Sequence, residues 1–228
     1  MPQASIVFLF DIDNTLLDND RVVSDLRNYL DCFGPQAKDR YFSLFEELRD
    51  QLGYADYLGA LQRYRVENPT DARLLKMSSF LVDYPFANRL YPNSLDAIAH
   101  VKQWGKAVVL SDGDVVFQPR KAERSGIAEA VDGNVLIYIH KEQMLADVMS
   151  KYPADHYVLV DDKVRILSAI KEAWGNKLTT IFPRQGHYAL DEKSVRSYPM
   201  PDITIDRIGR ILDLDLNTIL NAALPRRS

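Results

Sequence analysis

Two carboxylates separated by a single residue follow a short apolar segment near the N-terminus. The segment runs from Ile6 to Phe10, and Asp11 and Asp13 come directly after it. A short, continuous apolar run is typical of a strand that is covered on both faces. Ionised carboxylates at the end of such a strand must be paired, hydrated or bound to a cation. We therefore ask which other residues would meet them there.

Polar side chains also gather at the ends of three later apolar segments. They are Ser111-Asp112-Gly113-Asp114 at the end of 107–111, His140-Lys141 after 135–139, and Asp161-Asp162 after 156–160. In an open parallel sheet, ligands bind at the carboxyl ends of the strands, near the point where the strand order reverses. The carboxylates of Asp11 and of Asp161 or Asp162, with the backbone carbonyl of Asp13, would form an oxygen-rich site that suits Mg²⁺.

The segments that must position these residues alternate between strand and helix. Helices are expected at 94–104, 114–125, 141–151 and 164–174, and each precedes a short apolar strand, at 107–111, 135–139, 156–160 and 178–182. A further strand at 202–205 and an apolar helix at 206–221 complete the chain. This alternation predicts an α/β fold with a doubly wound, Rossmann-like parallel sheet.

The stretch between the first two strands has a different pattern. From Asp20 to about Phe86, apolar residues recur at three- and four-residue steps, which predicts four amphipathic helices. We therefore expect an inserted α-helical domain over 17–91 and a core domain formed by 1–16 and 92–228.

The order of the polar sets resembles the four motifs of the haloacid dehalogenase-like (HAD) hydrolase superfamily. The matching stretches are DIDNT, LSDGD, HKE and VDD, and the helical insertion falls where this superfamily carries a helical cap domain. The resemblance covers about 1–16 and 92–185. It implies a magnesium-dependent phosphatase that cleaves a small, soluble phosphate monoester.

The resemblance also assigns roles to the acids. Asp11 would be the nucleophile that forms an aspartyl-phosphate, and Asp13 would protonate the leaving group and later activate water. Asp11 and Asp13 would bind Mg²⁺ together with Asp162 or, as second choice, Asp161. Because Asp161 and Asp162 are adjacent, the last motif of the family can be aligned with either of them.

The remaining motif residues would bind the substrate phosphate. Ser111 would hydrogen-bond the phosphoryl oxygens, helped by backbone N–H groups of the turn that contains Asp112 and Gly113. Lys141 would offset the negative charge that develops there. Arg184 and His187, which follow the last core strand, could reach a substrate anion or the cap.

Two departures from the family pattern stand out. Asn14 occupies a position that is often glycine, and Ile166 and Leu167 occupy the region where a spaced acidic residue often follows the last motif. The adjacent pair Asp161-Asp162 would then take over that function.

Other chemistries stay open alongside the phosphatase interpretation. Phosphomutases share the same nucleophile and acid, whereas dehalogenase-type members do not carry aspartate at the position of Asp13. Phosphonatase-type members use a cap lysine, and both candidates, Lys38 and Lys76, fall in polar stretches. A non-catalytic binding protein with this fold is the alternative from another class.

The composition limits the partners and the compartment. The 28 basic and 32 acidic residues give no indication of nucleic-acid binding, and no apolar stretch is long enough for a membrane span. The single cysteine, Cys32, excludes an internal disulfide, and we expect it to pack inside the helical insertion. These features favour a cytoplasmic protein, and its oligomeric state cannot be inferred.

Overall fold

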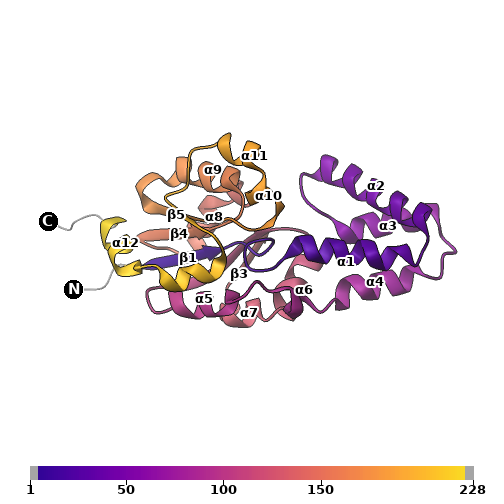
Figure 1. The fold of residues 1–228 in the computed structure, drawn as a ribbon, viewed down its shortest axis with the longest axis horizontal. Helices are drawn as coiled ribbons and strands as arrows, with labels where there is room; N and C mark the ends of the chain where they lie inside the picture. Colours follow the sequence, from indigo (N-terminus) through magenta and orange to yellow (C-terminus); the bar gives the residue numbers. More distant parts are fainter. Residues whose placement is uncertain (1–4, 224–228) are drawn as a thin grey trace.

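The computed structural model describes residues 5–223, and its centre is a six-stranded parallel sheet (Figure 1). The strand order is β3-β2-β1-β4-β5-β6. The strands are β1 (Ile6–Phe10), β2 (Lys106–Asp112), β3 (Val135–Tyr138), β4 (His156–Val160), β5 (Leu178–Pro183) and β6 (Ile203–Ile205). The predicted α/β fold with a doubly wound parallel sheet is confirmed.

The two central strands fix the position of the site. β1 pairs with β4 in parallel, with Phe10 opposite Val160, and both strands are buried along their whole length. The chain winds outward from β1 through β2 to β3 on one side and from β4 to β6 on the other. The reversal of strand order therefore lies between β1 and β4, and a ligand site is expected at their carboxyl ends.

Apolar side chains alternate between the two faces of the sheet, and helices cover both faces. Phe8 and Phe10 belong to one core cluster, and Val7 and Leu9 belong to the other. The first face is covered by α5 (Ser94–Val101), α6 (Phe117–Arg124), α7 (Ile127–Ala130) and α12 (Leu216–Ala223). The second is covered by α8 (Leu145–Lys151), α9 (Val164–Trp174), α10 (Gly186–Leu190) and α11 (Glu192–Arg196).

Four helices between β1 and β2 extend to one side of the sheet (Figure 1). They are α1 (Asn19–Asp31), α2 (Pro35–Leu52), α3 (Tyr57–Glu67) and α4 (Leu74–Asp83), and we call them the insertion. The ends of α2 follow from its sequence. Pro35 lacks the backbone N–H that would be unpaired in the first turn, and Gly53 takes the left-handed conformation that ends the helix.

The two connections between the insertion and the core run side by side. The backbone N–H of Asp18 donates to the carbonyl of Arg89 at 2.7 Å, and that of Tyr91 donates to Leu16 at 3.0 Å. The chain thus enters and leaves the insertion through two connecting segments that are hydrogen-bonded to each other. The domain limits of 17 and 91 stay a prediction.

Some details differ from the expectation. The helix expected at 141–151 starts with a 3₁₀ turn, η2 (Lys141–Gln143), and the helix expected at 206–221 divides into η4 (Ile208–Asp213) and α12. Cys32 does not pack inside the insertion: it follows the last turn of α1 and is exposed. No helix within residues 5–223 is long and apolar enough to cross a membrane.

Candidate active site

Asp11 lies at the centre of a buried polar cluster at the carboxyl ends of β1, β2 and β4. Its backbone N–H continues the β1–β4 ladder by donating to Val160 at 3.0 Å. Its Oδ1 accepts hydrogen bonds from Nζ of Lys141 at 2.6 Å and from Oγ of Ser111 at 3.1 Å. Oδ2 is buried and has no hydrogen-bond partner. Three predicted residues thus meet, and one oxygen of Asp11 stays free.

Asp161 and Asp162 join Asp11 in an acidic triad. One carboxylate oxygen from each residue lies within 4.8 Å of the other two, and all three side chains are buried. Both oxygens of Asp162 lack a hydrogen-bond partner. The Asp162 backbone N–H donates to Oγ1 of Thr15 at 3.0 Å, which ties the end of β4 to the loop after β1. The buried oxygens of Asp11 and Asp162 that have no partner could bind a hard cation such as Mg²⁺, whereas Asp161 already pairs with Lys141 at 2.6 Å.

Burial and the proximity of like charges determine the pKa values of the acids in this cluster. Burial raises the pKa of Asp162 well above its ordinary value, and the charges of Asp161 and Asp11 raise it further. Burial also raises the pKa of Asp161, to about 6, although the Lys141 ammonium opposes the shift from 2.6 Å. A bound cation would oppose both shifts, because it favours the ionised carboxylates.

Lys141 is the buried cation of the cluster. Burial acts to lower its pKa, but the carboxylates of Asp11, Asp161 and Asp112 outweigh burial and raise it well above the ordinary value. Lys141 is therefore charged at any physiological pH. Its 3₁₀ turn is fixed by Asp112, whose Oδ1 accepts the Lys141 backbone N–H at 2.7 Å.

Asp13 faces a different direction from the triad. Its Oδ1 lies 2.5 Å from Nζ of Lys121, which is fully buried on α6, and its Oδ2 accepts a hydrogen bond from Nε2 of Gln118 at 3.3 Å. The same Gln118 amide donates to Ser111 at 3.0 Å. The Asp13 carboxylate is thus outside the acidic triad, which leaves its backbone carbonyl as the group that could serve a metal.

The turn after β2 departs in part from its predicted role. The Gly113 backbone N–H donates to the Tyr138 carbonyl at 2.9 Å, so this amide is not free for a phosphate. Gly113 is needed for space, because a Cβ atom there would lie 2.6 Å from Cβ of Gln118. Asp114, two residues before the N-cap residue Val116, accepts from the backbone N–H groups of Val116 and Phe117 and so stabilises the start of α6.

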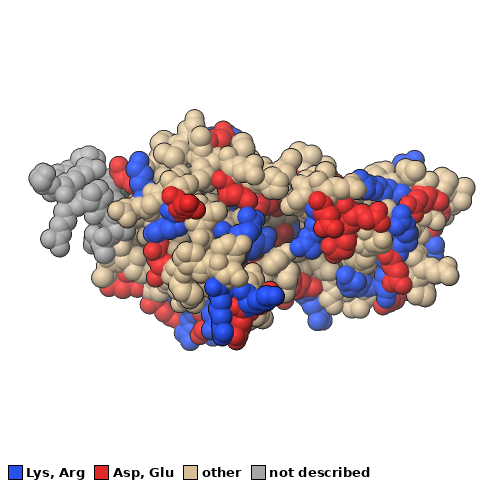
Figure 2. Space-filling view, turned by 90° about the horizontal axis from the view of Figure 1, so that it is seen from above, with Lys and Arg blue, Asp and Glu red and all other residues tan. Residues whose placement is uncertain are grey.

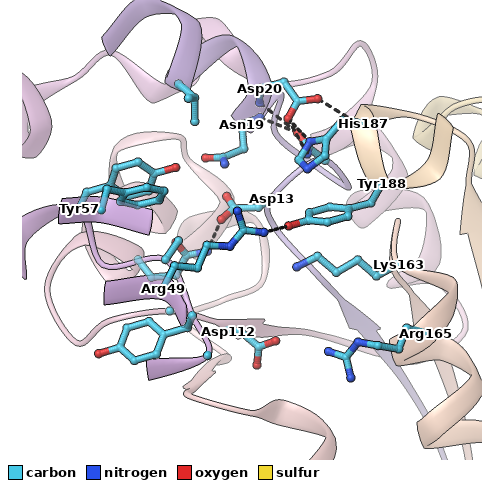
Figure 3. Close-up of a pocket in the computed structure, with 18 of the residues that line it drawn as sticks. Asp13, Asn19, Asp20, Arg49, Tyr57, Asp112, Lys163, Arg165, His187 and Tyr188 are labelled. Atoms are coloured by element: carbon cyan, nitrogen blue, oxygen red, sulfur yellow. Dashed lines mark hydrogen bonds and ion pairs between the residues drawn. The ribbon is translucent and has the colours of Figure 1, made fainter. Parts of the chain in front are cut away.

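A cavity of about 610 Å³ lies between the core and the insertion (Figure 3). Asp13, Asp112 and Gly113 line it, whereas the buried side chains of Asp11, Ser111 and Lys141 do not. The insertion contributes polar, charged and aromatic lining residues, among them Asn19, Asp20, Arg27, Phe42, Phe45, Glu46, Arg49, Tyr54 and Tyr57. On the face seen from above, basic and acidic side chains are interspersed around the hollow between the two parts (Figure 2).

The segment after β5 bridges the core and the insertion. Nδ1 of His187 lies 2.5 Å from Oδ1 of Asp20, at the start of α1, and the His187 backbone N–H donates to the same carboxylate at 2.8 Å. The hydroxyl of Tyr188 accepts a hydrogen bond from Nη2 of Arg49 on α2. His187 therefore contacts the insertion and lines the cavity, but the exposed Arg184 does not line it.

Asn14 takes the backbone conformation for which glycine is common. Its φ is 59°, in the left-handed region that asparagine tolerates better than most residues. Its Oδ1 accepts the backbone N–H groups of Asn19 and Asp20 at 3.0 and 3.2 Å, which anchors the start of α1. Gln185 clamps the same loop by donating to the Thr15 carbonyl at 2.6 Å.

Several of these residues were not singled out from the sequence. A lysine on the apolar face of a helix is a usable signal for Lys121, since Phe117, Lys121 and Ala122 share the buried side of α6. Arg49 and Tyr188 gave no such signal, because both belong to stretches that contain many polar residues. Their contact depends on the way the insertion folds back over the core.

Comparison with known proteins identifies the family. The model of the haloacid dehalogenase-like hydrolases matches residues 7–173. A solved haloacid dehalogenase-like hydrolase of Burkholderia xenovorans LB400 is 62% identical, with a TM-score of 0.88, over 94% of this chain and 100% of that one. No curated protein matches the chain.

More distant structures share the fold. A haloacid dehalogenase-like family hydrolase of Xanthomonas campestris is 17% identical, with a TM-score of 0.65, over 97% of this chain and 94% of that one. The L-2-haloacid dehalogenase of Xanthobacter autotrophicus, with chloropropionic acid covalently bound, is 16% identical, with a TM-score of 0.59, over 91% and 97%. The motif geometry and the family match agree, and the chain belongs to the haloacid dehalogenase-like hydrolases.

Proposed function

We propose that this protein is a magnesium-dependent phosphatase that hydrolyses a small phosphate monoester through an aspartyl-phosphate on Asp11. The observation that carries the proposal is the acidic triad: Asp11, Asp161 and Asp162 are buried together, and three oxygens, one of Asp11 and both of Asp162, have neither a hydrogen-bond nor an ion-pair partner. Charges arranged in this way are costly without a cation. The balanced charge and the single cysteine of the chain favour a cytoplasmic location.

The contacts of Asp11 suit a nucleophile. Ser111 and Lys141 both donate to Oδ1, which fixes the orientation of the carboxylate and leaves Oδ2 free to attack phosphorus. Mg²⁺, held by Asp11, by Asp162 or Asp161 and by the Asp13 carbonyl, would reduce the repulsion between this carboxylate and the phosphoryl group. The Lys141 ammonium and the Ser111 hydroxyl would bind the transferring phosphoryl oxygens.

The position of Asp13 suits proton transfer. Its carboxylate lines the cavity, so it can reach the leaving-group oxygen of a substrate whose phosphate lies against Asp11. Asp13 would give its proton to the leaving alcohol and then take a proton from the water that hydrolyses the aspartyl-phosphate. Lys121 and Gln118 hold the carboxylate in one orientation through both steps.

Other chemistries of the family have less support in this site. A phosphonatase needs a lysine that reaches the substrate from the cap, but Lys38 pairs with Asp31, Lys76 is exposed, and neither lines the cavity. Dehalogenation gives no role to Asp13, because a halide leaves without a proton. Phosphomutase chemistry uses the same nucleophile and acid, and the transfer of phosphate to an added alcohol would distinguish it.

The test is hydrolysis of p-nitrophenyl phosphate and a panel of small phosphate esters, with Mg²⁺ and with EDTA. We expect turnover that requires Mg²⁺ and that falls by at least about 10³-fold in Asp11→Asn. Single-turnover reactions quenched in acid should contain phosphorylated wild-type protein and none in the variant. Turnover that survives in Asp11→Asn would exclude Asp11 as the nucleophile, and release of halide from 2-haloacids in place of phosphate would show a dehalogenase.

A further inference from the structure

The cavity contains an arginine that is directed inward from the insertion. Arg49 lies on α2, and Figure 3 shows its guanidinium group directed at the Tyr188 hydroxyl. The Tyr188 hydroxyl accepts from Nη2 and holds the side chain across the gap between the insertion and the core.

Arg49 has more N–H donors than its two hydrogen-bond partners use. Its hydrogen-bond partner across the gap, the Tyr188 hydroxyl, is neutral, and its one ion pair within residues 5–223 is with Glu46, one turn earlier on α2, at 3.4 Å. The side chains of this pair are 42% and 53% exposed, so the pair contributes little. A guanidinium group has five N–H donors in a planar fork that matches a carboxylate or a phosphate.

The opposite wall adds positive charge. Lys163 and Arg165 line the cavity from the start of α9, and Figure 3 shows both pointing into it. Arg165 pairs with Glu142 at 3.1 Å. Lys163 forms no direct ion pair in the described chain, but although burial acts to lower its pKa, the nearby carboxylates of the acidic triad raise it. The cavity thus places cations on two facing walls.

Three acids that line the cavity already have partners. Asp13 pairs with Lys121, Asp20 pairs with His187, and Asp112 accepts the Lys141 backbone N–H. The fourth, Glu46, is the exposed partner of Arg49. The cavity therefore has N–H donors that could bind a second anion, in addition to the phosphate that would lie against Asp11.

We propose that Arg49 is a specificity-determining residue that binds a second anionic group, a carboxylate or a phosphate, on the leaving-group alcohol of the substrate. This inference rests on the proposed phosphatase function. Tyr188 is a positioning residue that holds the guanidinium group over the cavity, and Lys163 and Arg165 add to the positive potential. An ester with a neutral leaving group would leave Arg49 without its ligand.

The experiment compares paired esters that differ in this one group. 3-Phosphoglycerate and glycerol 3-phosphate test a carboxylate, and 1,3-propanediol bisphosphate and propyl phosphate test a second phosphate. The quantity measured is the selectivity ratio. It is kcat/KM for the ester whose leaving group carries the second anion, divided by kcat/KM for the ester whose leaving group is neutral. We expect a ratio of about 10 to 100 in the wild type for one of the two pairs, since a charge-assisted bidentate contact has that effect.

The variants test which residue produces the ratio. Arg49→Met should bring it close to 1, Arg49→Lys should restore part of it, and Tyr188→Phe should lower it about threefold by releasing the guanidinium group. Arg65→Met, on the exposed side of α3, is the matched control and should keep the wild-type ratio. Because the ratio is taken within one variant, a general loss of stability does not change it.

The failures of the two proposals are distinguishable. Magnesium-dependent hydrolysis with wild-type ratios near 1 for both pairs would overturn the role of Arg49 and leave the phosphatase function standing. An equal loss for both esters in Arg49→Met would also overturn it, because Arg49 would then act on the transferring phosphate. The absence of phosphate release from every ester would overturn the phosphatase function, and this inference with it.

Discussion

The ammonium group of Lys121 lies 2.5 Å from Oδ1 of Asp13, although these residues are 108 positions apart in the chain. Lys121 is fully buried, and its second contact is with Oδ1 of Asn19 at 3.0 Å. A buried lysine needs such partners, because an unpaired charge there would be costly. The acid proposed for proton transfer is therefore held by a specific cation from α6.

Lys121→Met should impair catalysis more than folding. Methionine keeps the length and packing of the side chain, but Asp13 would lose the cation that orients it, and we expect kcat to fall by about 10- to 100-fold. Steady-state kinetics on the best ester, over a range of pH, checks this. Lys102→Met, which removes a partly exposed lysine paired with Asp132, is the control. Equal activity in both variants would show that Asp13 does not depend on Lys121.

Asp162→Asn should raise the thermal stability without metal and reduce the stabilisation that Mg²⁺ provides. Burial and the neighbouring carboxylates of Asp161 and Asp11 raise the pKa of Asp162, so the neutral amide should raise Tm in EDTA, by about 2–4 °C for each 1 kcal/mol of strain relieved. The wild type should gain stability on addition of Mg²⁺, and the variant should gain less.

Differential scanning fluorimetry with a Mg²⁺ titration measures both effects without any substrate. Asp50→Asn, which changes an exposed acid on α2, should behave as the wild type in both conditions. A wild-type Tm that is unaffected by Mg²⁺ at millimolar concentrations would contradict the metal site.

His156 should make the free energy of unfolding depend on pH. Burial lowers its pKa below the ordinary 6.5, and the nearby Lys171 lowers it further, while Asp202 opposes the shift. Between its folded pKa and about 6.5 the unfolded chain binds more protons, so stability should be full above that window and fall as the pH falls through it.

Urea unfolding at pH values from 5 to 7.5 measures this dependence. His156→Gln can keep a hydrogen bond to Thr179, which lies 2.9 Å from Nε2, and the variant should lack this part of the pH slope. Other groups titrate in the same range, so the difference between the two proteins is the relevant quantity. Identical slopes would show that His156 titrates normally in the folded protein.

Gly186→Ala should destabilise the protein more than Gly133→Ala. Both glycines have φ of 75°, so both substitutions carry the same backbone cost of about 1 kcal/mol. At Gly186 a Cβ atom would lie 2.4 Å from Cβ of Asn14, whereas at Gly133 it would meet nothing within 4 Å. Crowding should therefore add about 1–3 kcal/mol at Gly186 alone. Chemical denaturation of the two variants gives the difference in the free energy of unfolding. Equal decreases would mean that the Asn14 loop can move away from the added Cβ atom at no cost.

The strand ends were predictable because a parallel sheet places them at one edge. Apolar runs identified β1, β2, β3 and β4, and the polar residues after them do meet: Asp11, Ser111, Lys141 and Asp161 form one hydrogen-bonded and ion-paired cluster. The sequence pattern also predicted the four helices of the insertion. In each case the periodicity that determines the element is local, so it can be read from the chain.

The contacts between the insertion and the core could not be predicted in the same way. The pairs Arg49–Tyr188 and Asp20–His187 join residues more than 130 positions apart, and they depend on the angle at which α1 and α2 fold over the sheet. No periodicity encodes that angle. The direction of the Asp13 side chain depended likewise on Lys121, whose position follows from the packing of α6.

The family model ends at residue 173, but the segment that bridges the two parts of the molecule lies beyond it. In this segment, Gln185 contacts the loop after β1. His187 contacts the start of α1, and Tyr188 contacts Arg49. A substitution in this segment would therefore change the contacts that position the insertion and leave the motif residues in place. The substrate contact proposed for Arg49 could thus be altered through Tyr188 without any change in the four motifs.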